Sequence, residues 1–366
     1  MTLIFKPNYE ITPKTAQNLV QIESLREKIL HLPLTPTVLK SLRESARLFT
    51  THYSTMIEGN RLVPDQIEDV LKHRGHFPGR ERDEHEVKGY YTALEKVEQW
   101  VNTSAMLTEK MIQSLHALVM GDGRRNASPT LYRDGQNVIK DGASGRIVYM
   151  PPEAADVQEL MTSMVIWIND QEELPAPIIA GIAHYQFATI HPYYDGNGRT
   201  ARLLTNLILH LGGYDLKGLY SLEEYYARNL GAYYDAISVG ESHNYYMGRA
   251  ESSITGWVEY FIEGMRHSFE SVLTLMQEKA LTKQPDHSAI LRKLDPKKRK
   301  ALDLFIDFET VTSKQIAVFF GFKPRTTSNL CAQWVEDGFI EVINPSKKAR
   351  TYGLVNLYKV LIDLSS

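Results

Sequence analysis

The sequence has few cysteines, no long apolar runs and little net charge, and each of these excludes a class of protein. It contains one cysteine, Cys331, which excludes an internal disulfide framework and any cysteine-based zinc site. No stretch reaches the roughly 18 apolar residues that a membrane span requires, and the first residues lack the apolar core of a secretory signal. The formal net charge is only −3, so no general attraction to nucleic acid or anionic membrane is expected. These absences predict a cytoplasmic protein without a membrane partner.

The composition is that of a soluble globular protein. Of the 366 residues, 43% are hydrophobic and 23% are charged, and the length suffices for two or three domains. Apolar side chains recur at helical spacing through most of the chain up to residue 278. We therefore expect a mostly α-helical fold.

Residues 191–202 concentrate side chains that suit phosphate chemistry. The stretch separates two apolar runs of helical spacing, Ile178–Ile190 and Leu203–Leu211, so it predicts a loop between two buried helices. Gly196 and Gly198 lie where the second helix should begin, and they let backbone amides come close to a ligand. A helix N-terminus offers unpaired N–H groups and the positive end of the macrodipole, which together favour a phosphate.

Four side chains of this loop complete the chemistry. Arg199 and Arg202 are three residues apart, so both lie on one face of the first helical turns and can bind phosphate oxygens. Asp195 is a hard oxygen ligand suited to Mg²⁺ that is shared with phosphates. His191 begins the loop, where a catalytic base would lie. Each feature alone is common in ordinary turns, but their combination within twelve residues predicts a polyphosphate site.

The string HPYYDGNGRTAR, from His191 to Arg202, resembles the signature of the Fic family, H-P-F-x-D/E-G-N-G-R-x-x-R. It departs from the signature only by Tyr193 in place of phenylalanine, which keeps an aromatic ring. Fic proteins transfer a nucleotide moiety, usually AMP from ATP, to a hydroxyl side chain of a target protein. The resemblance implies that His191 takes the proton from that hydroxyl and that Asp195 holds Mg²⁺. It assigns the phosphates to Asn197 with the amides of Gly196 to Gly198, and to Arg199 and Arg202.

The two glycines also bear on the type of transfer. The Doc-like kinases of the family lack them and bind the nucleotide in the opposite direction. Because this sequence keeps both glycines, AMP transfer is favoured over phosphate transfer.

A second resemblance lies upstream, at the end of a predicted helix from Val38 to about Ile57. Ser54, Glu58 and Gly59 match the inhibitory motif S/T-x-x-x-E-G/N that precedes many Fic cores. In those proteins the glutamate pairs with the second arginine of the signature, here Arg202, and blocks the γ-phosphate. The resemblance therefore implies that Glu58 holds the activity low. In some family members the same glutamate supports removal of AMP.

Residues 138–149 consist of two short β-prone runs around a glycine-containing loop, which predicts a hairpin. The hairpin could be a surface flap without a role. In Fic proteins a hairpin at this place covers the active site and holds the target segment by strand addition. On that basis we expect the target protein to dock on residues 138–149, and self-modification and a homodimer are left open.

Tyrosines are frequent between Tyr220 and Val239, and such an aromatic stripe is most often core. In related sequences one tyrosine of a similar pair contributes to the adenine pocket, and Tyr234 is the candidate here. Many family members carry an asparagine seven residues later, where this sequence has Glu241.

The C-terminal segment, residues 295–366, has another organisation. Three short helices and two strands around a basic loop at 346–350 predict a winged helix-turn-helix. Eleven Lys and Arg against eight Asp and Glu give a net charge of only +3, without the concentration of positive charge that is usual in DNA-binding modules. DNA binding and docking to protein are both left open.

The sequence thus predicts a mostly α fold, with a Fic-type helical core, a β-hairpin flap and a C-terminal winged helix. The expected divisions are a regulatory segment at 1–100, a catalytic core at 101–278, a linker at 279–294 and the winged helix at 295–366. The expected activity is Mg²⁺-dependent transfer of AMP from ATP to a Ser, Thr or Tyr hydroxyl, held low by Glu58. The alternative is a nucleotide-sensing transcriptional regulator that acts through the winged helix.

Overall fold

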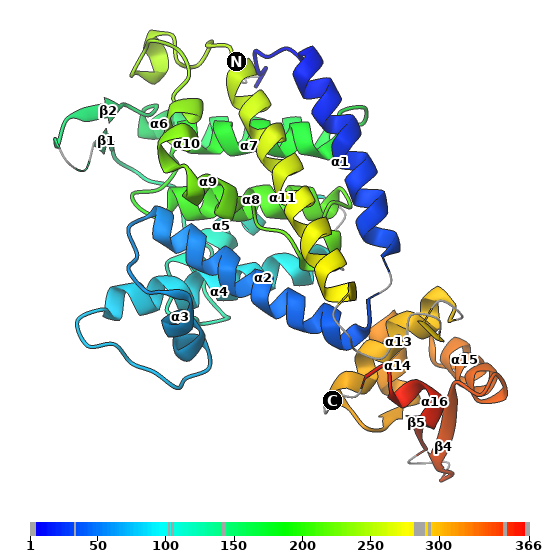
Figure 1. Ribbon diagram of the computed structural model, residues 1–366. Coiled ribbons are helices and arrows are strands. Elements are labelled where there is room, and N and C mark those ends of the chain that lie inside the picture. Colours follow the sequence, from blue (N-terminus) through cyan, green and yellow to red (C-terminus); the bar gives the residue numbers. More distant parts are fainter. Residues whose placement is uncertain are drawn as a thin grey trace. The chain divides into compact units, whose positions relative to one another are not determined.

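The computed structural model describes residues 5–32, 34–101, 103, 106–140, 142, 144–281, 290, 291, 294–346 and 350–362. The chain divides into two units, residues 1–30 with 45–273 and residues 31–44 with 274–366. The fold is mostly helical, as expected (Figure 1). None of the helices in the described ranges is long and apolar enough to cross a membrane.

Eleven α-helices of the described chain lie before residue 282. Their bounds are α1 (Pro13–His31), α2 (Pro36–Ile57), α3 (Pro64–Leu71), α4 (Glu81–Val101), α5 (Glu109–Val119), α6 (Ala154–Asn169), α7 (Ala176–Ile190), α8 (Asn197–Leu211), α9 (Leu222–Arg228), α10 (Leu230–Ile237) and α11 (Thr255–Leu281). Helix α2 contributes its first turns to the second unit and its last turns to the first.

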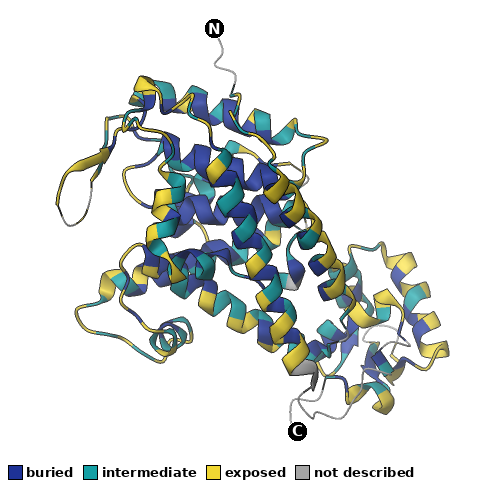
Figure 2. Ribbon diagram, turned by 45° about the horizontal axis from the view of Figure 1, so that its top comes forward, coloured by how far each residue is buried: buried dark blue, intermediate teal, exposed yellow. Residues whose placement is uncertain are grey.

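Helices α7 and α8 form the centre of the first unit. They pack on each other, α8 also contacts α4 and α5, and α6 covers α7. Both are buried along nearly their whole length (Figure 2). Helix α7 is buried because its apolar residues lie on all sides of the helix, which leaves no polar face for water. The two buried helices hold the loop 191–196 between them.

Local signals explain several of the helix ends. Thr108 accepts a hydrogen bond from the amide of Met111 and caps α5, as its sequence position predicts. Proline at the first turn starts α3 and α7. The hairpin consists of β1 (Ile139–Lys140) and β2 (Ile147–Tyr149), which pair antiparallel within the predicted range. Residues 141 and 143 of its turn lie outside the described residues.

The second unit contains helices and a small antiparallel sheet of order β3-β5-β4. The elements are α13 (Pro296–Asp307), β3 (Val311–Thr312), α14 (Ser313–Phe320), α15 (Pro324–Glu336), β4 (Ile340–Asn344), β5 (Thr351–Leu354) and α16 (Asn356–Lys359). Trp334, Phe305, Phe339 and Cys331 belong to its core. The strand β3 and the helix α16 are not among the predicted elements. Most of the predicted linker, and residues 347–349 of the basic loop, lie outside the described residues.

Candidate active site

The loop between α7 and α8 is shaped by two left-handed residues and one asparagine. Helix α7 ends at His191 with a φ of 51°, and α8 begins after Gly196 with a φ of 73°. Asn197 accepts a hydrogen bond from the amide of Tyr193 at 3.0 Å and donates one to its carbonyl at 2.8 Å. The Asn197 side chain is therefore used to close the loop, and the first amides of α8 are what the loop offers to an anion.

The imidazole of His191 has the protonation state that a base requires. Its Nδ1 lies 3.4 Å from the carbonyl of Ala188, which accepts the Nδ1–H and leaves Nε2 free to take a proton. Burial lowers the pKa of His191 to about 4, and the contact with Ala188 offsets only part of that effect. His191 is consequently neutral at physiological pH.

Arg199 is a buried cation with few partners. Its side chain is 3% exposed, and its Nε has no hydrogen-bond partner in the described part of the chain. The nearest carboxylate oxygens, of Glu86 and Asp195, lie 3.7 Å and 3.6 Å from its guanidinium, beyond hydrogen-bond distance. Because buried charged groups are normally hydrogen-bonded, this arrangement fits an anion that binds to Arg199.

Arg202 is fully paired with the upstream motif. Its Nη2 donates to the Glu58 carboxylate at 2.8 Å and to the carbonyl of Ser54 at 2.9 Å, while its Nε donates to the Ser54 hydroxyl at 2.7 Å. Burial works to lower the pKa of Arg202, but the Glu58 carboxylate together with Tyr233 and Tyr90 raises the pKa above its ordinary value. Two residues that are far apart in the sequence thus form one ion pair.

The Glu58 carboxylate also covers the first turn of α8. A Cβ atom placed on Gly198 would overlap with it, so only glycine allows this approach. The carboxylate therefore lies at the helix N-terminus that suits a phosphate, and it is held there by Arg202.

Asp195 is the exposed acid of the loop. One of its oxygens accepts the amide of Gly196 at 2.7 Å, and its side chain is 62% exposed. No group of three or more His, Cys, Asp and Glu side chains in the described ranges could hold a metal ion. A single carboxylate next to an anion site fits Mg²⁺ that takes its remaining ligands from phosphates and water.

The two tyrosines of α10 differ in burial. Tyr233 is buried, and its hydroxyl lies 3.0 Å from Nε2 of His184. Tyr234 is 47% exposed. Burial raises the pKa of Tyr234, and the charge of Glu58 adds to that effect. Glu241 is exposed.

Arg133 belongs to the site although nothing in its sequence context indicates this. It is buried, and its guanidinium donates to the carbonyls of His191 at 3.0 Å and Gly135 at 3.0 Å, and also to that of Pro152. Its amide donates to the carbonyl of Pro192 at 2.9 Å. The Arg133 side chain therefore connects the two ends of the hairpin segment to the start of the loop 191–196.

His116 on α5 is the second such residue. Its ring stacks on Tyr193 with centroids 3.6 Å apart, and its Nε2–H donates to the carbonyl of Asp195 at 3.0 Å. The Tyr193 ring is 2% exposed, so the aromatic anchor expected at this position is present. A single histidine among the buried residues of α5 gives no signal of such a contact in the sequence.

Comparisons with known proteins agree with this geometry. Residues 106–209 match the Fic/DOC family model. The chain is 31% identical over 289 residues to protein adenylyltransferase fic-1 of Caenorhabditis elegans, a match that covers 75% of this chain and 52% of the relative. It is 33% identical over 217 residues to the protein of the same name from Caenorhabditis briggsae, covering 56% and 40%. The chain thus spans about half or less of the length of these relatives.

Solved structures show the same fold. A Fic family protein from Desulfovibrio desulfuricans G20 superposes with a TM-score of 0.62 at 24% identity, over 96% of this chain and 99% of that one. Fic-1 from C. elegans superposes with a TM-score of 0.56 at 23% identity, over 72% and 73%. Residues 106–209, which include the loop 191–196, thus match a Fic domain, and the similar solved structures share the fold.

Proposed function

We propose that the chain is a protein adenylyltransferase, which transfers AMP from ATP to a Ser, Thr or Tyr hydroxyl of a target protein. The observation that carries this proposal is the loop 191–199, which joins a neutral imidazole at the end of α7 to the N-terminus of α8. The relatives named protein adenylyltransferase support the choice of ATP and of a protein acceptor.

The reaction assigns one role to each side chain. Nε2 of His191 takes the proton of the acceptor hydroxyl, whose oxygen forms a bond to the α-phosphorus of ATP while the bond to the β-phosphate breaks. Pyrophosphate leaves, and the α8 amides with Arg199 and Arg202 hold its oxygens. Tyr234, which is partly exposed on α10, would contact the adenine.

Asp195 is the residue that would hold Mg²⁺. When bound, this ion supplies positive charge that neutralises the phosphates. The chain's own contribution is the exposed carboxylate, kept in position by the amide of Gly196.

Glu58 would keep this activity low. Its carboxylate lies on Arg202 and against Gly198, where the outer phosphates must bind, so ATP has to displace it to bind productively. The same carboxylate could hold a water near a modified hydroxyl and so support AMP removal. To separate the two roles, wild type and Glu58→Gly are given pre-labelled target, and removal at the wild-type rate by the variant contradicts the hydrolytic role.

The hairpin is the proposed docking place of the target. Ile147 and Val148 on β2 are 51% and 41% exposed, and Met150 at its end already pairs with the segment around Asn244. An exposed strand edge of this kind can add one more strand through main-chain hydrogen bonds. The acceptor can be a second protein or a second copy of this chain.

Two labels distinguish AMP transfer from phosphate transfer. Glu58→Gly is incubated with a cell lysate and ATP labelled at the α- or the γ-phosphate. Label on protein from α-labelled ATP alone, lost with EDTA, is the expected result. Label from γ-labelled ATP alone would contradict the proposal, as would transfer that is insensitive to EDTA.

A second candidate function, DNA binding by residues 295–366, is favoured by one surface. The exposed side chains at the start of α15 are polar or basic and carry no acid: Lys323, Arg325, Thr326, Ser328 and Asn329. This is what a helix that reads a DNA groove needs. A mobility-shift assay with genomic fragments at two salt concentrations tests it, and absence of binding at low salt contradicts it.

A further inference from the structure

A buried carboxylate outside the Fic signature faces one of its arginines. Glu86 lies on α4, its side chain is 9% exposed, and its Oε1 is 3.7 Å from Nη1 of Arg199. In the described part of the chain, one other carboxylate lies within ion-pair distance of Arg199, that of Asp195 at 3.6 Å, and its side chain is exposed. The cationic head of Arg199 is therefore placed between one buried and one exposed carboxylate.

Two other side chains hold both oxygens of Glu86 in place. Asn60 donates to Oε2 at 3.1 Å, and Arg82 donates to Oε1 at 3.0 Å. Asn60 is itself buried and held by the carbonyl of Asp83 at 2.9 Å. Glu86 consequently has little freedom to move towards or away from Arg199.

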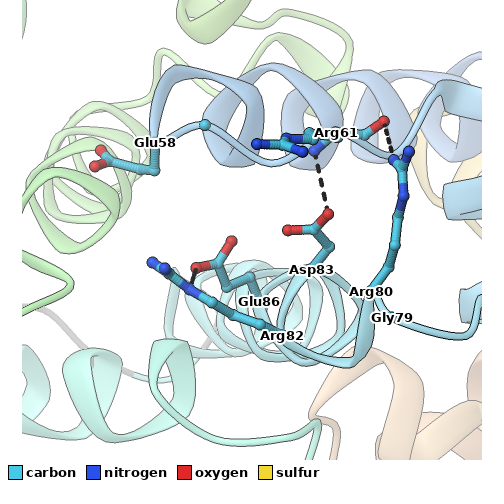
Figure 3. A pocket seen from close by; sticks show the side chains of 8 residues that line it. Glu58, Arg61, Gly79, Arg80, Arg82, Asp83 and Glu86 are labelled. Carbon is cyan, nitrogen blue, oxygen red and sulfur yellow. Dashed lines mark hydrogen bonds and ion pairs between the residues drawn. The ribbon is translucent and has the colours of Figure 1, made fainter. Parts of the chain in front are cut away.

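Glu86 also lines a pocket of about 260 Å³ next to the proposed phosphate site. Figure 3 shows Glu58 on one wall of this pocket, pointing away from it, with Glu86 and Arg82 on α4 across from it. Its charged lining is balanced, with Arg61, Arg80 and Arg82 against Glu58, Asp83 and Glu86, so the pocket itself indicates no anionic ligand. Its wall supplies the buried carboxylate that faces Arg199.

We propose that Glu86 is a positioning residue for ATP binding, which holds the Arg199 guanidinium in the orientation that the phosphates require. The inference rests on the proposed nucleotide site. A buried arginine without a nearby anion is costly and would turn towards solvent. With Glu86 at ion-pair distance but not hydrogen-bonded, the donors of Arg199 stay in place and remain available to phosphate oxygens.

The opposite effect is also physically reasonable and makes the proposal testable. A carboxylate close to a phosphate site repels the phosphates, so its removal could tighten ATP binding. Positioning and repulsion therefore predict changes of opposite sign in the dissociation constant for ATP.

The experiment measures ATP binding by calorimetry in the Glu58→Gly background, where the proposed block is absent. Glu86→Gln keeps the shape of the side chain and removes its charge, and the dissociation constant should rise about tenfold, equivalent to ~1.4 kcal/mol. The matched control is Glu84→Gln. Glu84 lies on the same helix, is equally buried and holds the amide of Phe77, but has no contact with Arg199 in the described structure. It should leave the dissociation constant unchanged.

A double variant tests whether Glu86 acts through Arg199. Once Arg199→Gln has removed the guanidinium, Glu86→Gln should weaken ATP binding no further. An unchanged or tighter ATP complex in Glu86→Gln overturns the proposal, as does equal weakening by Glu84→Gln or a loss that persists without Arg199.

The readout also separates this proposal from the proposed function. Binding is measured directly, so a protein that binds ATP but transfers no AMP contradicts the proposed function and leaves the role of Glu86 decided by its own result.

Discussion

At the scale of single residues, burial decides the chemistry of His191. Its pKa of about 4 lies below the ordinary value, so the neutral form persists as the pH falls and is lost only near that pKa. Transfer by Glu58→Gly should therefore stay level from about pH 8 to about pH 5.5 and fall below that range. A half-maximal rate near pH 6.5 would show that His191 titrates normally.

The same residue gives a second result in that assay. A positioned general base typically contributes about 10²- to 10⁴-fold, so His191→Ala should reduce transfer by that factor. ATP binding should remain, because His191 does not hold the phosphates. Transfer by this variant at a near wild-type rate means that another group is the base.

At the scale of elements, the link between hairpin and loop depends on Arg133. Arg133→Ala leaves the buried carbonyl of Pro152 and the carbonyls of His191 and Gly135 without their donor, which is costly. We expect faster hydrogen exchange at residues 147–149 and at least a tenfold loss of transfer. The control is Arg124→Ala, an exposed arginine outside the hairpin, which should change neither. Equal effects of the two variants would exclude a specific link.

The ends of helices in this chain can be predicted from neighbouring residues, whereas contacts between residues far apart in the sequence cannot. Thr108 predicts the start of α5, and the glycine at position 59 marks the end of α2, because capping and left-handed conformations depend on nearby residues. The pairing of Glu58 with Arg202 joins residues 144 positions apart, and only the family resemblance implied it. Arg133, His116 and Glu86 were missed because a buried polar contact across helices leaves no periodic pattern. The strand β3 and the helix α16 are too short to produce a periodic pattern in the sequence.

At the scale of the whole molecule, buried histidines couple stability to pH. Burial lowers the pKa of His184 to about 3 and that of His116 to about 4. Between about pH 6.5 and pH 4 the unfolded chain takes up these protons and the folded chain does not, so the free energy of unfolding falls as the pH falls. Each group contributes a slope that approaches ~1.4 kcal/mol per pH unit.

Urea unfolding followed by circular dichroism at about pH 7 and pH 5.5 measures this loss. His184→Gln should reduce the difference between the two pH values, whereas His85→Gln, at an exposed position, should not. If the two variants have the same pH dependence, the buried imidazole is not the cause.

The proposed regulation depends most on one arrangement, in which the Glu58 carboxylate lies where the outer phosphates of ATP must bind. Each ~1.4 kcal/mol of bias towards that blocked arrangement reduces the competent population about tenfold. The direct measurement is transfer of label from α-labelled ATP, including self-labelling, by wild type, Glu58→Gly, and Glu58→Gly combined with His191→Ala. We predict that Glu58→Gly exceeds wild type by one to two orders of magnitude (~10- to 100-fold) and that the double variant transfers about 10²- to 10⁴-fold less than Glu58→Gly. A Glu58→Gly protein that binds ATP but transfers no more label than wild type would contradict the account.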